Sequence, residues 1–447
     1  MNKFFDIDED KEYKYKILVY PNITYQRKLE NDSYIVVLKN VIEVVNKLRD
    51  DVHWTLLLPY STPSVDHFDN VNILVYDMPS YPNAMRTHFD FNKIHDLIDW
   101  TRNDYDIVYS HLPEHTLQLS NFFYNNTNIM PKIIGYCHWF EVDENTGYEK
   151  RMLMHNIAGV LEMEEMGVNS IWLKNHILDK VKDIYSKKTL DKLEKIIQPH
   201  YLGVDEIDIP DRNKQIGLTN FVFNHRPNEY TGFNWFVNAM NEIWKERQDF
   251  RVYFTLADVN EPWATKPKKE QVISRKDYMN YLKKMDIGIG TFEKYSAWSI
   301  STTDGLSHGV PYVLPNNLVY PEMLGNDYPL LYDNREHFKK LIVKLINEQD
   351  LRNEAHLWIE KNIQDFTWEN RVSKWFNNWD IFNLSLASRT ESYEKIVNFI
   401  KSKNSVTKKE ILEYMGWGIR IPFSPYRNLL RTESNIKLTK DRYEWIT

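Results

Sequence analysis

The sequence has almost no cysteine and no long apolar segment. Its single cysteine, Cys137, excludes an internal disulfide and a cysteine-rich zinc site, and it is typical of a reducing compartment. No apolar run approaches the roughly 18 residues that a membrane-spanning helix needs. The charged N-terminus, MNKFFDIDEDKEYKYK, lacks the apolar core of a secretory signal. We therefore expect a cytoplasmic protein without a membrane partner.

Metal-binding motifs are also lacking. There are 14 histidines, but none forms a pair with an acidic neighbour at the spacing of metalloproteases, so we predict no metal site. Aromatic residues are abundant, with 14 Trp, 28 Tyr and 21 Phe, and we assign most of them to packing. A chain of 447 residues is too long for one ordinary core, which favours two or three domains.

Short β-branched runs alternate with helical patterns along most of the chain. In the first half, strands are expected at 15–20, 52–59, 71–77, 106–111 and 131–139, and helices at 33–50 and 92–102. A second series has strands at 219–226, 250–256, 286–292 and 310–315, and helices at 231–247 and 277–285. This alternation predicts two parallel, doubly wound α/β sheets, joined by a segment near 200–215. Residues 335 to about 383 are expected to be helical.

The stretch SISTTDGLSHGVPYVLP, residues 299–315, places small polar side chains at the start of a helix beside a buried strand. A helix N-terminus has unpaired backbone N–H groups and a partial positive charge. Ser301, Thr302 and Thr303 are small enough to let a phosphate reach those groups. Asp304, one turn into the helix, is placed to accept from a ribose hydroxyl. A simply capped helix is the alternative interpretation.

Two other polar residues end predicted strands. Arg226 lies at the carboxyl edge of the second sheet, where doubly wound domains bind ligands, and its guanidinium suits a diphosphate. His138 ends the strand IIGYCHW of the first sheet. Glu322, in VYPEML, is a further candidate for contact with sugar hydroxyls. The alternatives are a strand-end histidine with satisfied hydrogen bonds for His138 and a surface helix cap for Glu322.

Taken together, these segments resemble the GT-B glycosyltransferases of the retaining, nucleotide-sugar-dependent kind, over roughly residues 15–383. The matching segments are YLGVDE for the family's Asn-Gly-Val-Asp hinge, HRPNEYTGF for its Gly-Arg-x4-Lys-Gly segment, TTDGLSHGVPYV for its Glu-Ala-x-x-x-Gly-x-Pro-Val segment, GYCHWFE for its strand-end histidine and FTWENRV for its late Phe-Ser-Trp helix. The resemblance implies two Rossmann-like domains, an N-terminal acceptor domain over 1–205 and a nucleotide-sugar donor domain over 206–385.

The same resemblance implies roles for individual residues. Arg226 takes the place of the diphosphate arginine, Asp304 that of the ribose-binding acid, and His138 lies near the donor sugar. The implied cofactor is a nucleotide diphosphate sugar, with a UDP-sugar as the expected donor. A cationic side chain and a helix terminus can stabilise the leaving diphosphate, so no metal is expected.

The chain departs from the family pattern near the diphosphate. The family lysine five residues after the arginine is Thr231 here, which we place at the donor site, and the first acid of the family's paired acids falls on Ser296. The missing positive charge could come from Lys294, Arg27 or Lys28. A degenerate, inactive enzyme is therefore an alternative.

Residues 390–447 differ in character, with eleven basic and seven acidic residues and so a net charge of +4. Helices are expected at 392–403 and 408–415, a third in SPYRNLLRTE, and a hairpin that turns at Lys440 and Asp441. Three helices and a terminal hairpin resemble a winged-helix domain, whose third helix and wing would contact DNA. A helical module for packing or association is the alternative.

A sugar-transferase core joined to a DNA-reading tail suggests DNA as the acceptor. Phage DNA glucosyltransferases, which modify hydroxymethylated pyrimidines, have related cores, and RPNEYTGF is similar to their Arg-x4-Lys-Gly-Phe segment. If a phage encodes the chain, it would work in the host cytoplasm. Two alternatives stay open: a glycosyltransferase acting on glycan, lipid or protein acceptors, and a non-catalytic DNA-binding protein that senses sugar nucleotides.

Overall fold

The chain divides into two compact units. Unit 1 comprises residues 1–167, 177–198 and 375–447, and unit 2 comprises residues 168–176 and 199–374. The computed structural model describes residues 15–22, 33–59, 71–78, 88–102, 105–128, 130–138, 140, 149–210, 217–265, 274–375, 393–415, 430, 435–439 and 442–446. No helix in these ranges is long and apolar enough to cross a membrane.

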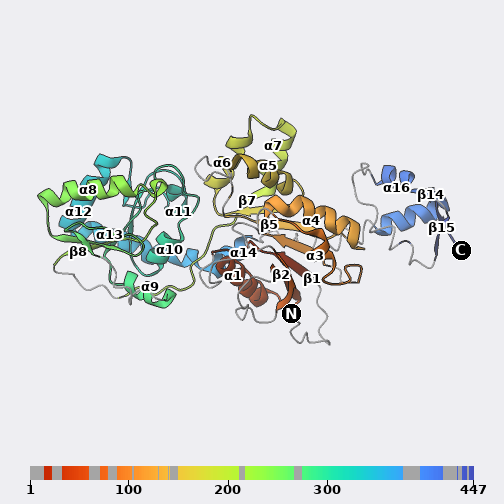
Figure 1. Ribbon diagram of the computed structural model, residues 1–447, viewed down its shortest axis with the longest axis horizontal. Helices are drawn as coiled ribbons and strands as arrows, with labels where there is room; N and C mark the ends of the chain where they lie inside the picture. Colours follow the sequence, from red (N-terminus) through yellow and green to blue (C-terminus); the bar gives the residue numbers. More distant parts are fainter. Residues whose placement is uncertain are drawn as a thin grey trace. The chain divides into compact units, whose positions relative to one another are not determined.

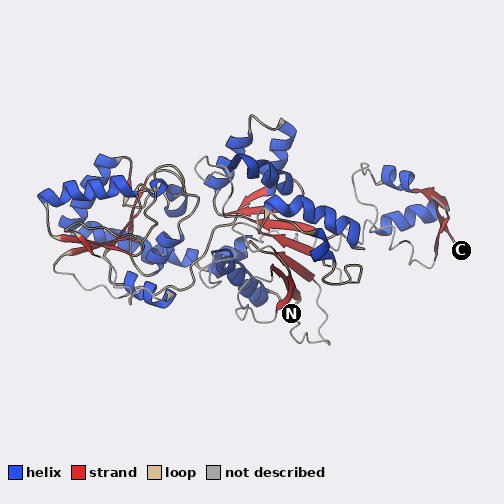
Figure 2. Ribbon diagram, in the orientation of Figure 1, coloured by secondary structure: helices blue, strands red, loops and turns tan. Residues whose placement is uncertain are grey.

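A seven-stranded sheet lies almost entirely in unit 1, and helices flank its strands on both sides (Figures 1 and 2). Its strands are β1 (Tyr15–Tyr20), β2 (Val52–Pro59), β3 (Val71–Tyr76), β4 (Ile107–Ser110), β5 (Lys132–Tyr136), β6 (Glu165–Val168) and β7 (Ile197–Pro199). Its helices are α1 (Ser33–Leu48), α3 (Phe91–His95), α4 (Pro113–Asn126), α5 (Glu149–Val160), α6 (Ile171–Val181) and α7 (Lys187–Ile196).

The strand order of this sheet is β3-β2-β1-β4-β5-β6-β7, and the pairs from β3 to β6 are parallel. The strands are almost continuously apolar because helices cover both faces of such a sheet. The order reverses between β1 and β4, and doubly wound sheets bind ligands beyond the carboxyl ends of the strands at such a switch point. The helix expected at 92–102 is shorter, since only Phe91–His95 is helical.

Unit 2 contains a six-stranded parallel sheet with the corresponding order, β10-β9-β8-β11-β12-β13. Its strands are β8 (Thr219–Phe223), β9 (Phe250–Phe254), β10 (Ala264–Thr265), β11 (Ile287–Ile289), β12 (Tyr312–Pro315) and β13 (Leu331–Tyr332). Its helices are α8 (Phe233–Glu246), α9 (Arg275–Leu282), α10 (Ile300–Ser307), α11 (Tyr320–Leu324), α12 (Arg335–Asn347), α13 (Gln349–Asn362) and α14 (Trp368–Trp375). The switch point lies between β8 and β11.

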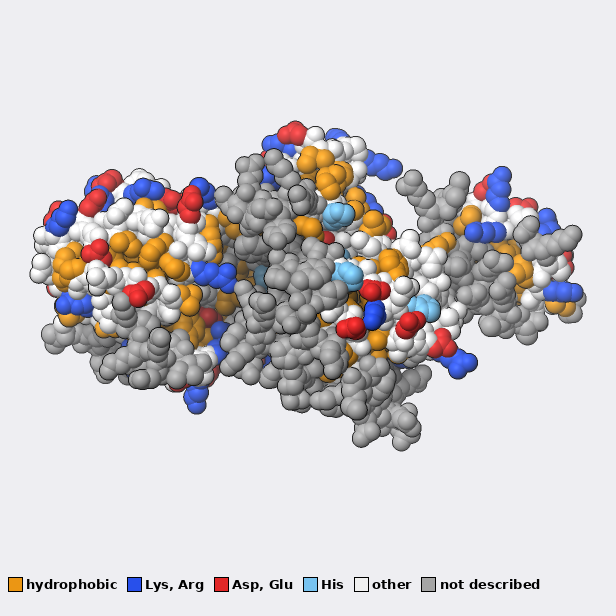
Figure 3. Space-filling view, viewed as in Figure 1, with side chains coloured by type: hydrophobic (Ala, Val, Ile, Leu, Met, Phe, Trp, Pro, Cys, Tyr) orange, Lys and Arg blue, Asp and Glu red, His pale blue; other side chains and the backbone are white. Residues whose placement is uncertain are grey.

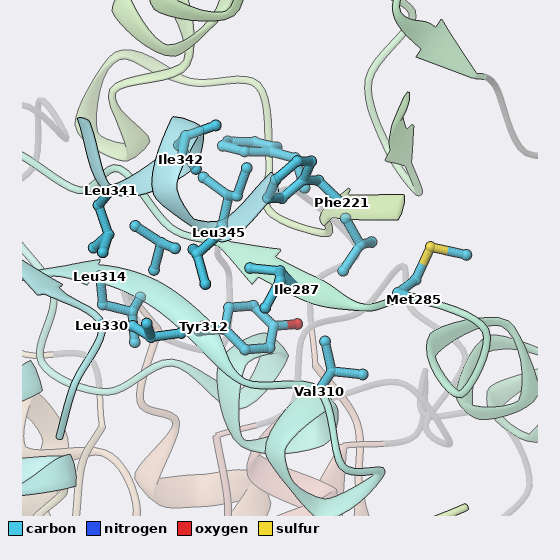
Figure 4. Packing of buried hydrophobic residues seen from close by; sticks show 14 of the residues in the cluster. Phe221, Met285, Ile287, Val310, Tyr312, Leu314, Leu330, Leu341, Ile342 and Leu345 are labelled. Carbon is cyan, nitrogen blue, oxygen red and sulfur yellow. The ribbon is translucent and has the colours of Figure 1, made fainter. Parts of the chain in front are cut away.

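The core of unit 2 forms between this sheet and its helices. Figure 4 shows Phe221 and Ile287 from neighbouring strands beside Leu341 and Leu345 of α12, and all four belong to one buried cluster. On the face shown in Figure 3, basic and acidic side chains are interspersed over unit 2, at the left of the view. Two doubly wound parallel sheets therefore account for most of the chain, as the alternation of patterns predicts.

The C-terminal residues form a small cluster of their own. Helical residues 393–403 and α16 (Lys408–Tyr414) pack with an antiparallel sheet of order β14-β16-β15, where β14 is Ser405–Thr407, β15 is Ile436–Thr439 and β16 is Arg442–Trp445. Thr407 caps α16 with a capping box. The predicted hairpin strands are thus confirmed, whereas most of the predicted third helix lies outside the described residues.

Candidate functional site

Three polar residues follow β8 at the switch point of the unit 2 sheet. Asn224 and His225 are buried and Arg226 is exposed, and none of the described residues forms an ion pair with Arg226. His225 lies among aromatic rings, and burial lowers its pKa to about 3, so its imidazole is neutral at pH 7. The edge therefore presents one uncompensated guanidinium to solvent.

A tight turn fixes the backbone of Arg226. The Thr231 hydroxyl donates to the carbonyl oxygens of Arg226 at 2.8 Å and Asn228 at 2.7 Å, and Thr231 is only 1% exposed. Gly232 follows with φ of 67°, and a Cβ there would lie 2.0 Å from the Thr291 carbonyl oxygen, so only glycine fits. Thr231 therefore holds the turn from inside, while the Arg226 side chain points outward.

Helix α10 begins at Ile300, and Ser299 is its N-cap. The Ser299 hydroxyl accepts from Thr302 N at 3.2 Å, and the Ser299 carbonyl accepts from Thr303 N at 3.0 Å. The amides that lack an acceptor within the helix are therefore those of Ile300 and Ser301. Thr302 and Thr303 are buried, so the open end of the helix lies one to two residues before the position predicted from the sequence.

Asn224 joins the end of β8 to the start of α10. Its side-chain amide donates to the Ser301 carbonyl oxygen at 2.8 Å and to the Tyr278 hydroxyl at 2.8 Å. The Tyr312 hydroxyl donates to the same carbonyl at 3.1 Å. Arg226, two residues after Asn224, and the open amides of α10 are thereby brought to one edge of the sheet.

Asp304 is 5% exposed and faces an arginine that the sequence motifs did not indicate. Arg275, the first residue of α9, donates to Asp304 Oδ1 at 2.9 Å and to Asp205 Oδ2 at 2.9 Å. Burial raises the pKa of Asp304 to about 6, although Arg275 lowers it. The Trp368 indole also donates to Asp205, so the LGVD and FTW segments meet here.

Glu322 caps a helix that lies far away in the sequence. Its carboxylate accepts from Ile171 N at 2.6 Å and Trp172 N at 2.8 Å, at the start of α6. A carboxylate stabilises the positive end of a helix dipole. The structure therefore gives Glu322 a structural partner within unit 2.

His138, in unit 1, follows β5 and packs on Tyr34, with ring centroids 3.9 Å apart. The Ser33 hydroxyl and His138 Nε2 share a hydrogen bond of 2.9 Å. Burial lowers the pKa of His138 to about 3, so the imidazole is neutral and hydrogen-bonds without carrying charge. Cys137 is buried beside the Tyr34 hydroxyl, at 3.5 Å.

Three cationic residues are candidates for the positive charge that the family lysine supplies, and the structure describes only one of them. Lys294 forms an ion pair of 2.7 Å with Glu229, and both side chains are exposed. Arg27 and Lys28 lie outside the described residues. Within the described ranges, no group of three His, Cys, Asp or Glu side chains is placed to hold a metal ion.

Solved structures provide the comparison. Sucrose-phosphate synthase from Thermosynechococcus elongatus is similar with a TM-score of 0.63 at 10% identity, covering 84% of this chain and 100% of that chain. The two parallel sheets of this chain have the GT-B fold. HepE from Anabaena, in complex with UDP and glucose, has a TM-score of 0.57 at 10% identity, covering 82% and 99%. An E. coli structure described as trehalose-6-phosphate bound with UDP-2-fluoro glucose has a TM-score of 0.55 at 11% identity, covering 81% and 98%. No protein-family model and no curated protein sequence matches this chain.

Proposed function

We propose that the protein is a glycosyltransferase that moves a sugar from a nucleotide diphosphate sugar to a hydroxyl acceptor. The observation that carries this proposal is the exposed Arg226 at the switch point of unit 2, which forms no ion pair with any described residue and is joined through Asn224 to the open N-terminus of α10. Both groups attract phosphate, and doubly wound sheets bind ligands at this edge. The expected donor is a UDP-sugar, because two structures of similar fold are described with UDP or a UDP-sugar.

In this proposal, residues 206–385 bind the donor. Arg226 and the amides of Ile300 and Ser301 take up the negative charge that develops on the leaving diphosphate. Asp304 has lone pairs left after its contacts with Arg275 and accepts from a ribose hydroxyl. Ser301 lines the phosphate, while Thr231, Thr302 and Thr303 hold the turn and the helix that surround it.

Residues 1–205 would supply the acceptor side, with the neutral imidazole of His138 donating to or accepting from a sugar hydroxyl. Glu322 would act indirectly, by accepting from Ile171 N and Trp172 N and so fixing the start of α6. We propose that the anomeric configuration is retained and that no metal is required, since a guanidinium and a helix terminus already provide the positive charge. Adding EDTA to the reaction and determining the anomeric configuration of the product by NMR test these two points.

We further propose that the acceptor is a hydroxymethylated pyrimidine in DNA and that residues 390–447 contact the duplex as a winged helix. The predicted wing, β15 and β16, exposes Lys437 and Arg442, and Arg442 Nε is held by the Ser405 hydroxyl at 2.8 Å. The net charge of +4 on this segment supports contact with phosphates. A base inside a duplex must also be flipped or distorted to be reached.

A carbohydrate acceptor is the second candidate. The structures of similar fold include one described as a sucrose-phosphate synthase and one as a lipopolysaccharide outer core galactosyltransferase, with TM-scores of 0.63 and 0.53. A non-catalytic sensor is the third, because Thr231 and Ser296 stand where the family has a lysine and an acid, and both hydroxyls are hydrogen-bonded internally.

One experiment separates these functions. The purified protein is incubated with a panel of sugar nucleotides and with hydroxymethylated DNA, unmodified DNA or oligosaccharides, and the products are identified by mass spectrometry. A hexosylated or pentosylated nucleoside only with hydroxymethylated DNA supports the DNA enzyme. A sugar on an oligosaccharide supports the second candidate, and binding of the donor without any transfer or hydrolysis supports the sensor.

A further inference from the structure

One arginine of unit 2 is half-buried and has no hydrogen-bond acceptor among the described residues. Of the seven arginines in the described part of unit 2, five donate to acceptors: Arg247 to Asp249, Arg251 to the Phe250 carbonyl, Arg275 to Asp205 and Asp304, Arg335 to Glu293, and Arg352 to the Leu345 carbonyl. Arg226 and Arg371 have no such acceptor among the described residues. Arg226 is exposed, so water solvates it, whereas Arg371 is half-buried.

Aromatic rings hold the Arg371 guanidinium. Its Cζ lies 4.5 Å from the ring centroid of Phe366 and 5.3 Å from that of Tyr201. Its Nε is buried and has no acceptor among the described residues. Burial lowers the pKa of Arg371, which reflects the cost of removing the cation from water, and the charges of Asp365 and Tyr201 offset this only in part. Cation–π contacts return only part of this cost.

A second buried hydrogen-bond donor belongs to a residue that packs on the ring of Tyr201. Trp298 packs on Tyr201 with ring centroids 5.6 Å apart, and its Nε1 is likewise buried without an acceptor in the described part of the chain. Trp298 directly precedes Ser299, the N-cap of α10. Two donors that lack acceptors, one of them a cation, therefore flank Tyr201 next to the proposed diphosphate site.

We infer that Arg371 and Trp298 form a second anion contact of the donor site, which supplies the positive charge that Thr231 does not. A diphosphate oxygen is an acceptor without donors, so it would satisfy both groups. This inference rests on the proposed function.

The test is calorimetric titration of the full-length protein with UDP and with inorganic pyrophosphate. Arg371→Met should weaken binding of both at least tenfold, and Arg371→Lys should restore part of the affinity because it keeps the charge. Arg251→Met is the matched control: Arg251 also stacks on a ring, Trp244, at 5.1 Å, but donates to a backbone carbonyl, and its loss should leave binding unchanged.

Uridine distinguishes a direct contact from a structural one. If Arg371 touches the diphosphate, Arg371→Met weakens UDP but not uridine, and it lowers the salt dependence of UDP binding. Equal losses for UDP and uridine, or unchanged UDP affinity in a variant that keeps the wild-type Tm, would overturn the inference and leave the proposed function standing. Absence of UDP and pyrophosphate binding in the wild-type protein would overturn the proposed function itself.

Discussion

Arg226 and Asp304 belong to the same proposed site but differ in whether the charge of the side chain has an ionic partner. Arg226 has no ionic partner in the described chain, so its charge is available to a ligand. Asp304 is buried, but Arg275 is 2.9 Å away. Removing one partner of a buried ion pair leaves the other uncompensated, which costs more than the pair itself contributes. Asp304 therefore has a structural role in addition to any contact with a ribose.

The buried carboxyl of Asp304 should make stability depend on pH. Because burial raises its pKa to about 6, the folded protein binds a proton between pH 6 and 4 that the unfolded chain, with an ordinary Asp, binds only at lower pH. The contribution of Asp304 to the free energy of unfolding therefore increases as the pH falls through 6, by up to roughly 3 kcal/mol.

Urea unfolding of the wild type and of Asp304→Asn at several pH values measures this contribution, since the other titrating groups cancel in the difference. The wild type should gain stability relative to the variant as the pH is lowered from 7 to 4. A difference that does not change with pH, or that changes in the opposite direction, would show that Asp304 ionises in the folded protein as it does in the unfolded chain.

At the scale of elements, α10 depends on its cap. Ser299→Ala should remove the hydrogen bond to Thr302 N, cost about 1 kcal/mol of stability and fray the first turn. Because the amides of Ile300 and Ser301 are then no longer held in place, UDP affinity should also fall. Ser186→Ala, which removes the corresponding cap of α7, should cost similar stability without affecting UDP. Equal UDP affinities in the two variants would argue against a phosphate site at α10.

Gly203, in the segment that joins the two sheets, contacts Trp368 of α14 so closely that no larger residue fits at position 203. A Cβ on Gly203 would lie 2.6 Å from the Trp368 Cα, and Val204 N donates to the Phe366 carbonyl at 2.8 Å. Gly203→Ala should therefore separate the two segments and destabilise the protein by about 1–3 kcal/mol, the usual cost of overpacking. Measurement of the urea midpoint checks this, and an unchanged midpoint would mean that the contact is loose.

Period and composition predicted β1 to β5 of the first sheet and β8, β9, β11 and β12 of the second, because their buried runs are apolar on both faces. The short outer strands β6, β7, β10 and β13 were not predicted. Period and composition also did not predict that Arg275 lies opposite Asp304. The Ser274 and Asp277 capping box starts α9 two residues earlier than its apolar pattern suggests and so places Arg275 opposite Asp304. Likewise, the cap formed by Ser299 moves the open amides of α10 to Ile300 and Ser301. Contacts such as Glu322 with the start of α6 join residues about 150 positions apart, and no local pattern predicts them.

In the molecule as a whole, the C-terminal segment is basic although the full chain is acidic. The full chain has a net charge of −7, and residues 390–447 alone have +4. Charges of both signs alternate on the face of unit 2 shown in Figure 3, which is typical of a solvated surface rather than a nucleic-acid site. The tail is therefore the segment that we expect to contact DNA.

Removal of residues 390–447 should weaken DNA binding and make the remaining affinity less dependent on salt, since fewer counterions are released. Fluorescence anisotropy with labelled duplex at several salt concentrations gives both quantities. UDP affinity should be the same in the full-length and shortened chains, which controls for folding of the rest. Identical salt slopes in the two proteins would remove the argument for a DNA acceptor.

We propose that one guanidinium, that of Arg226, and the start of α10 hold the diphosphate of the donor. Calorimetric titration of UDP into the wild type and into Arg226→Ala tests it most directly. Loss of a charge-assisted hydrogen-bonding group should raise the Kd by roughly 10- to 100-fold, at an unchanged Tm because the Arg226 side chain is exposed. Equal affinity of the two proteins for UDP would show that Arg226 does not contact the diphosphate.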